Sequence, residues 1–244
     1  MTASPTPLPP LAEDAARVLV VVAHPDDIEY GAAAAVARWR AAGIDVVYLL
    51  ATYGEAGIDG MDPSEAAAVR AQEERDGAAE VGVERVRFLE HPDGTVDYGL
   101  PLRRDIARVI REERPQMVVS LTHRERFAGG GTNQADHRAV GLAALDACRD
   151  AGNRWVFPDL AAEGLEPWGG VRRVAFANSP SPTHAVDVSE YVDSAVASLE
   201  AHAQYLEGLG ADAPAPRELL TGILGAGGRL AGCSFALTVE VFDL

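Results

Sequence analysis

The sequence has few cysteines and a deficit of basic residues, and each shortage excludes a class of protein. Only two cysteines occur in 244 residues, Cys148 and Cys233. They are too few for a dense disulfide scaffold or a four-cysteine zinc site, so any zinc must be held mainly by His and carboxylate side chains. There are 21 Lys and Arg residues against 37 Asp and Glu residues, a formal net charge of −16. This charge disfavours nucleic acid and anionic membrane surfaces as partners.

The N-terminal segment lacks the parts of a signal peptide. Residues 1–14 contain no Lys or Arg and no apolar run, which makes a cytoplasmic location the default prediction. The prolines between Pro5 and Pro10 predict that residues 1–15 form a flexible arm outside the fold. Hydrophobic residues make up 48% of the chain, which is ordinary globular usage, and no stretch resembles an interdomain linker. We therefore expect residues 16–244 to form a single domain with no membrane insertion.

The hydrophobic pattern predicts strands that alternate with helices. The expected strands are 17–23, 45–52, 85–89, 116–121, 172–177, 185–188 and 235–241. The expected helices are 32–42, 64–81 with Ser64 as N-cap, 100–113, one that begins at Asp136, and 192–206, whereas 211–216 and 225–232 are expected to be loops. This alternation predicts an α/β fold with a Rossmann-like open, mainly parallel sheet and helices on both faces.

The turn after the first expected strand carries side chains suited to chemistry. Residues 24–29 read HPDDIE, which is one imidazole and three carboxylates in six positions. In an open α/β sheet, ligands bind beyond the carboxyl ends of the strands, so this turn is expected at a binding crevice. It has no glycine before Gly31, which disfavours a phosphate-binding loop. The residues instead suit a divalent metal ion and a general base.

A catalytic zinc site usually has three protein ligands, and His137 is the strongest candidate for the third. It lies near the start of a helix, after a long Gly-rich loop at 122–135 that follows a strand, and should therefore reach the same sheet edge as His24. Asp136 could orient an imidazole or hold a substrate hydroxyl. A plainer alternative stays open, in which Asp26, Asp27 and Asp136 only cap helices.

Two separated segments resemble the PIG-L (LmbE-like) family of zinc-dependent N-acetylglucosaminyl deacetylases. The stretch VVVAHPDDIEYGAAA is similar to the family signature A-H-P-D-D-x-E, and NQADHRAVG is similar to its second motif. The segment 70–93 and the order of strands and helices also resemble the family. The resemblance covers residues 17–150 well and the C-terminal third only loosely.

The resemblance implies roles for residues at matching positions. His24, Asp27 and His137 would bind one Zn²⁺ per chain, with other divalent metals as alternatives, and Asp26 would be the general base that activates a metal-bound water. Asp136 is the second expected catalytic residue. The expected substrate-binding residues are Arg70, Gln134, Glu55 and His123. For Arg70 a helix-surface pair with Glu73 or Glu74 is the alternative.

Gln134 departs from one well-known form of the second motif, which has a histidine three residues before the ligand histidine. Glutamine can donate a hydrogen bond but cannot serve as an acid. Either Asp26 therefore handles both proton transfers, or another histidine such as His123 or His184 supplies the acid.

The function implied by the resemblance is a metal-dependent N-deacetylase. It would remove an acetyl or related acyl group from a glucosamine-type sugar conjugate, a small-molecule substrate. Two alternatives stay open: a non-catalytic sugar- or metal-binding member of the same fold, and an amidase acting on a mycothiol-type S-conjugate. High usage of Ala, Arg and Gly favours a bacterial source, and relatives often form homo-oligomers, so a homo-oligomer is also considered.

Overall fold

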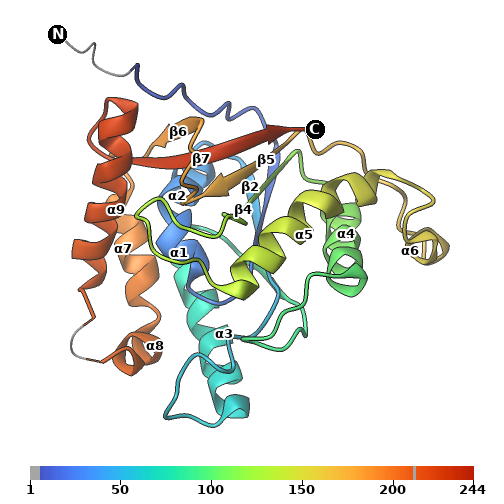
Figure 1. The fold of residues 1–244 in the computed structure, drawn as a ribbon, viewed down its shortest axis with the longest axis horizontal. Helices are drawn as coiled ribbons and strands as arrows, with labels where there is room; N and C mark the ends of the chain where they lie inside the picture. Colours follow the sequence, from blue (N-terminus) through green and yellow to red (C-terminus); the bar gives the residue numbers. More distant parts are fainter. Residues whose placement is uncertain (1–5, 211–212) are drawn as a thin grey trace.

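A seven-stranded sheet forms the centre of the computed structural model, which describes residues 6–210 and 213–244 (Figure 1). The strands are β1 (Arg17–Val22), β2 (Asp45–Leu50), β3 (Arg85–Phe88), β4 (Met117–Leu121), β5 (Arg173–Ala177), β6 (His184–Asp187) and β7 (Ala236–Asp243). Their order across the sheet is β3-β2-β1-β4-β5-β7-β6. The first five strands run parallel, and β7 pairs antiparallel with both β5 and β6. The predicted open, mainly parallel α/β sheet is confirmed.

Helices cover both faces of the sheet, as expected. They are α1 (Asp27–Gly31), α2 (Ala33–Ala41), α3 (Pro63–Glu80), α4 (Leu100–Glu113), α5 (Ala135–Gly152), α6 (Pro158–Ala162), α7 (Val192–Glu200), α8 (Ala203–Gly208) and α9 (Pro216–Ala231). In β1, Val18 and Val20 pack on the side of α2, α7 and α9, and Leu19 and Val21 on the side of α4 and α5. Figure 1 shows α7 and α9 away from α4 and α5. Because both faces of β1 are buried, this strand is continuously apolar.

The two sequence motifs meet where the strand order reverses. From β1 the chain proceeds outward to β2 and β3, then returns to β4 on the other side of β1. His24 follows β1, and α5 with His137 follows β4 after the long loop. Because open sheets bind ligands at such a reversal, the topology alone explains why motifs 113 residues apart share one site.

Several expected helix boundaries differ from the structure. The turn at 24–29 already contains the start of α1, and a separate helix α2 follows it. Helix α3 is capped by Asp62, whose side chain accepts the Ser64 N–H at 3.0 Å, and not by Ser64. The expected helix 192–206 is divided into α7 and α8, with the buried side chain of His202 between them.

The expected loop at 225–232 is wrong, because most of it is the C-terminal half of α9. A Cβ atom at Gly227 would clash with the carbonyl oxygen of Ala236, and one at Gly228 with that of Ser234. These glycines therefore let the helix approach β7 closely, and they do not mark a loop. In the expected loop 211–216, residues 211–212 lie outside the described residues, and Pro216 begins α9.

The Pro-rich segment is also packed more closely than expected. The Leu8 N–H donates to the Leu230 oxygen at 2.9 Å, and the Leu11 N–H donates to the Ala185 oxygen at 2.8 Å. Leu11 is 5% exposed and joins the core. The expectation of an arm outside the fold is thus wrong for residues 8–11, and residues 1–5 lie outside the described residues. None of the described helices is long and apolar enough to cross a membrane.

Candidate metal centre and active site

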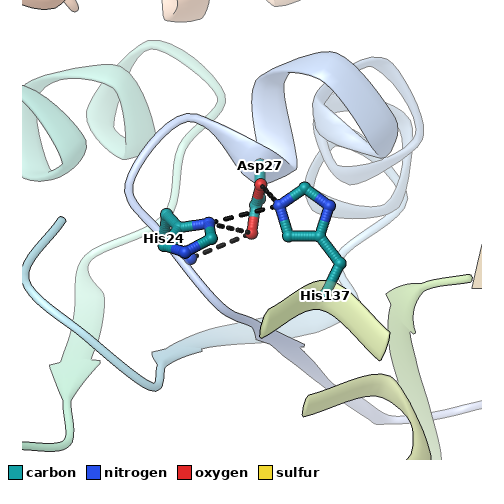
Figure 2. Close-up of side chains that lie close together, drawn as sticks. All are labelled: His24, Asp27 and His137. Carbon is teal, nitrogen blue, oxygen red and sulfur yellow. Dashed lines mark hydrogen bonds and ion pairs between the residues drawn. The ribbon is translucent and has the colours of Figure 1, made fainter. Parts of the chain in front are cut away.

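His24, Asp27 and His137 converge at the carboxyl edge of the sheet, and all three are buried (Figure 2). His24 Nδ1 lies 3.2 Å from His137 Nε2, and Asp27 Oδ1 lies 3.0 Å from that same nitrogen. Asp27 Oδ2 lies 3.6 Å from His24 Nδ1. Ligand atoms about 2.1 Å from a tetrahedral zinc ion are about 3.4 Å apart, so the spacing fits one shared cation.

Partners on the far side of each ring determine which nitrogen faces the centre. His24 Nε2 lies 3.0 Å from Asp93 Oδ1 and 3.4 Å from Asp136 Oδ2, both acceptors, so this nitrogen carries the proton. His137 Nδ1 lies 3.0 Å from the Asn133 side-chain oxygen, whose amide nitrogen donates to two backbone carbonyls. His137 Nδ1 is therefore also protonated. Both rings then direct a lone pair at the centre.

Asp27 supplies the third lone-pair donor. Its Oδ2 accepts the backbone N–H groups of Ala23 at 3.0 Å and His24 at 2.9 Å, which leaves Oδ1 for the centre. Two imidazole nitrogens and one carboxylate oxygen thus converge on one point. A cation is the partner that satisfies all three, and the set matches the His and carboxylate ligands of catalytic zinc.

The charges around the centre also favour a cation. Burial by itself lowers the pKa of His24, but Asp27, helped by Asp136 and Asp93, raises that pKa to about 12. Burial by itself raises the pKa of Asp27, yet His137 and His24 hold it well below its usual range. The site stabilises positive charge, and a divalent cation would take the place of the proton and leave His24 as the neutral imidazole that ligates metals.

Asp26 lies beside this centre and is 5% exposed. Its backbone is left-handed with φ of 92°, a conformation that costs a non-glycine residue about 1 kcal/mol or more. Arg70 Nη2 donates to Asp26 Oδ2 at 2.9 Å, and Glu74 Oε2 accepts the Asp26 N–H at 3.1 Å. Burial raises the pKa of Asp26 to about 6, partly offset by the Arg70 charge.

The side chains of Asp26 and Asp136 make no helix-capping hydrogen bond. Asp26 is the N-cap residue of α1, yet its side chain makes no capping hydrogen bond. The N-cap of α5 is Gln134, and Asp136 instead accepts the Gly94 N–H at 2.8 Å and the Val96 N–H at 3.2 Å. Asp136 therefore ties the third βα turn to His24, which is the imidazole-orienting role that the sequence suggested.

Arg70 is buried, so the alternative of a helix-surface pair with Glu73 or Glu74 is wrong. Besides Asp26, its guanidinium donates to the oxygens of Gly54, at 3.1 Å, and of Pro25. The guanidinium carbon lies 4.4 Å from the centre of the Tyr205 ring. Arg70 thus holds the base and its turn in place.

A second buried cluster lies behind Asp26. Glu29, Glu74 and His202 have fully buried side chains, and His202 Nε2 lies 3.6 Å from Glu29 Oε2 and 3.9 Å from Glu74 Oε2. The Ser198 hydroxyl donates to Glu29 at 2.8 Å. Burial, then the Glu29 charge, raises the pKa of Glu74 well above its ordinary value. The cluster supports the backbone of Asp26 through Glu74.

A cavity of about 1030 Å³ opens in front of the centre. Its polar wall comes from the N-terminal two thirds of the chain and contains His24, Asp26, Asp27, Arg70, Asp93, Gln134 and His137. The long loop contributes Phe127, Ala128, Gly129 and Gly131 to the lining.

Two expected substrate-binding residues do not line this cavity. Glu55 accepts the Asp93 N–H at 2.8 Å and so supports the turn that carries Asp93. His123 packs edge-on against Phe176, with ring centres 4.6 Å apart. Burial lowers the pKa of His123, which favours the neutral ring. Neither residue reaches a ligand in this arrangement.

Four residues of the site were missed by sequence reasoning. Asn133 stands inside the second motif, and Asp93 ends the third βα unit at the same sheet edge, so position could have indicated both. Tyr30 and Tyr205 also line the cavity. Tyr205 belongs to α8, and no local pattern links it to Arg70.

Fold and site together define an α/β protein with a buried His–Asp–His cluster that could hold a cation and an adjacent carboxylate, an arrangement suited to metal-assisted hydrolysis. The model of the PIG-L family, described as GlcNAc-PI de-N-acetylase, matches residues 19–148. The chain belongs to this family of deacetylases.

Similar proteins agree with this assignment. The diacetylchitobiose deacetylase of Thermococcus kodakarensis is 33% identical over 78% of this chain and 70% of its own length. The 1D-myo-inositol 2-acetamido-2-deoxy-alpha-D-glucopyranoside deacetylase of Kineococcus radiotolerans is also 33% identical, over 82% of this chain and 72% of its own. The structure of N,N'-diacetylchitobiose deacetylase from Pyrococcus horikoshii has the same fold, with a TM-score of 0.83, 21% identity, and coverage of 95% of this chain and 85% of that one.

Proposed function

We propose that this protein is a zinc-dependent hydrolase that removes the N-acetyl group from a glucosamine-type sugar conjugate. The observation that carries the proposal is the convergence of three lone-pair donors, on His24, Asp27 and His137, beside the buried carboxylate of Asp26 in a large cavity. The names of both relatives support it, since each describes deacetylation of an acetylated amino sugar.

The residues around the centre divide the work of hydrolysis. Zinc held by His24, Asp27 and His137 would supply a water of lowered pKa and polarise the acetyl carbonyl. Asp26 takes a proton from the attacking water as its oxygen bonds to the carbonyl carbon, and returns the proton to the nitrogen as the C–N bond breaks. Acetate and a free amine result. Arg70 donates to Oδ2 of Asp26 and so fixes the orientation of this carboxylate beside the centre.

In this proposal Asp26 makes both proton transfers. Gln134 lines the cavity, and neither His123 nor His184 is among the described residues that line it. Gln134 can donate a hydrogen bond to the substrate but cannot protonate the amine. Asp136 acts on His24 as a positioning residue and does not touch the substrate.

The alternatives make different demands on the site. A protein that only bound sugar or metal would not need a buried carboxylate free of the metal beside the centre, so Asp26 favours catalysis. An amidase acting on a mycothiol-type S-conjugate would use the same residues and differ only in substrate. A cytoplasmic location and a homo-oligomeric state stay predictions, and the chemistry depends on neither.

The test is acetate release from a panel that contains methyl N-acetylglucosaminide, diacetylchitobiose, an N-acetylglucosaminyl inositol and a cysteine S-conjugate. Each compound is measured with protein as purified, after chelator treatment, and after zinc add-back. We expect release that the chelator abolishes and zinc restores. Release that is indifferent to the chelator would overturn the metal mechanism. No release from any compound by protein with bound zinc would favour the binding alternative.

A further inference from the structure

The part of the cavity lining that comes from the C-terminal third of the chain is mainly apolar. Besides Gly227, helix α9 contributes Gly222, Ile223, Ala226 and Leu230 to the lining. Gly222, Ala226 and Leu230 follow at four-residue intervals, and Ile223 precedes Ala226 by three, so these residues share one helix face. Leu209, just after α8, and Phe127 of the long loop complete this surface. We name these six residues the α9 wall.

The α9 wall is apolar surface that the fold does not use. The opposite face of α9 carries Leu220 and Leu224, which are buried in the core. Leu209 and Leu230, by contrast, are 45% and 48% exposed, and both line the cavity. Exposed leucines that continue an enclosed cavity are typical of a ligand-binding surface. The Leu8 N–H bond to the Leu230 oxygen anchors this end of the helix to the N-terminal segment.

The cavity offers little to an anionic group. Arg70 is the only Lys or Arg among the described residues that line it. Both Nη atoms of Arg70 already donate to protein oxygens, of Gly54, Pro25 and Asp26. Away from the proposed metal ion, a phosphate or carboxylate on the substrate would therefore find no unpaired cationic side chain on the described walls, and an uncharged group suits them better.

The size of the cavity indicates which part of the substrate meets the α9 wall. Its volume of about 1030 Å³ is at the upper end of the range of about 300–1,000 Å³ for sites that hold drug-sized ligands. An acetyl group and one sugar ring fill only part of such a space. The acetyl group must lie at the metal centre, where it is removed. The remaining apolar surface is therefore available to the aglycone, the group attached to the sugar at its anomeric carbon.

We infer that the α9 wall binds an uncharged, apolar aglycone attached to the acetylated amino sugar. This inference rests on the proposed function and names the substrate class of the same site. Alkyl groups gain affinity from the area that they bury, and Leu209 and Leu230 would provide that area.

The test compares methyl and hexyl N-acetylglucosaminides, both below the concentration at which the hexyl glycoside aggregates. Acetate release and equilibrium binding are measured with the zinc-loaded full chain and with the double variant Leu209→Ser/Leu230→Ser. Leu100→Ser is the matched control, because Leu100 is 63% exposed and does not line the cavity. Two further compounds test other groups that could occupy the α9 wall: diacetylchitobiose tests a second sugar, and methyl N-octanoylglucosaminide tests a long acyl chain.

We expect the hexyl glycoside to have a KM and a Kd at least 10-fold below those of the methyl glycoside, with a similar kcat. The double variant should lose this preference, whereas the Leu100→Ser control should keep the wild-type preference and the wild-type kinetics on both glycosides. Equal Kd values for the two glycosides, or a preference for diacetylchitobiose or the octanoyl compound, would overturn the inference. Turnover of the methyl glycoside reports separately on the proposed function, and the Kd values test the inference even without turnover.

Discussion

The two walls of the cavity differ in chemistry, in origin along the chain and in the way that they are held. The polar wall carries His24, Asp27 and His137, whose remaining polar atoms bond to Asp93, Asp136, Asn133 and backbone N–H groups. The α9 wall has no charged side chain and exposes two leucines. One wall is fixed by a hydrogen-bond network, the other by the packing of a helix on β7.

In our account the polar wall carries out the reaction and the α9 wall selects the substrate. The family model matches residues 19–148, which contain Asp26 and all three residues of the candidate metal centre, while α8 and α9 lie outside that match. The polar wall thus provides the chemistry common to a family of deacetylases. In our account the α9 wall determines which conjugate this protein accepts, so changes to the two walls should have separable effects.

The largest effect should follow from removing a metal ligand. In His137→Ala, loss of one of three ligands should remove bound zinc and reduce acetate release to background, which metal analysis and kinetics on the same sample would show. His184→Ala is the matched control, since His184 lies on β6 and does not line the cavity. Retained activity in His137→Ala would mean that the centre is misassigned.

A smaller effect on zinc affinity is expected from a change at Asp93, which contacts His24 and not the proposed metal ion. Asp93→Asn weakens the acceptor for the His24 Nε2–H, and loss of such a partner typically reduces metal affinity or activity by about 10- to 100-fold. Zinc titration in a competing chelator would measure it. Asp97→Asn, an exposed aspartate four residues on, should bind zinc as wild type does. Equal zinc affinities for both variants would argue against the role of Asp93 in orienting His24.

The packing of the α9 wall can be tested with two substitutions on one helix. A Cβ at Gly227 would clash with the Ala236 carbonyl, so Gly227→Ala should lower the free energy of unfolding by about 1–3 kcal/mol. At Gly225 the nearest atoms belong to the Phe235 ring at 3.8 Å, so Gly225→Ala should be neutral or stabilising by up to about 1 kcal/mol. Denaturant unfolding would measure both, and equal stabilities would show that close packing on β7 is not required.

The buried cluster behind the polar wall should make stability depend on pH. Folding raises the pKa of Glu74 above its ordinary value of 4.5, so its contribution to stability is full below that value and is lost as pH rises through the raised pKa. The free energy of unfolding should fall over that range, and Glu74→Gln should flatten the decline. Glu80→Gln, at the exposed end of the same helix, should keep the wild-type slope. Identical slopes for both variants would contradict this account.

The difference between the polar wall and the α9 wall also explains which parts of the site the sequence could predict. The run RVLVVVA, the HPDDIE turn and the second motif lie next to parallel strands, and the strand order then determines where their side chains meet. For this reason the sequence could predict that His24, Asp27 and His137 lie together. Asp93 was missed because its role depends on the position of a neighbouring turn.

The α9 wall could not be predicted because its determinants are tertiary. The glycines at 225–232 resemble a loop locally, and only the close approach to Ala236 explains Gly227 in a helix. Tyr205 lies 135 positions from Arg70, and no pattern in the sequence predicts that the Arg70 guanidinium stacks on the Tyr205 ring. The Pro-rich segment was similarly expected outside the fold, because its pairing with Ala185 and Leu230 leaves no local signal.

The most direct test of the account is to measure bound zinc and acetate release together for wild type and Asp26→Asn. Asp26 is the group that distinguishes catalysis from binding in this centre. We predict one zinc per chain in both proteins and a loss of about 10²- to 10⁴-fold in acetate release for Asp26→Asn, the usual contribution of a general base. Full release by Asp26→Asn, or by zinc-free wild type, would contradict the account.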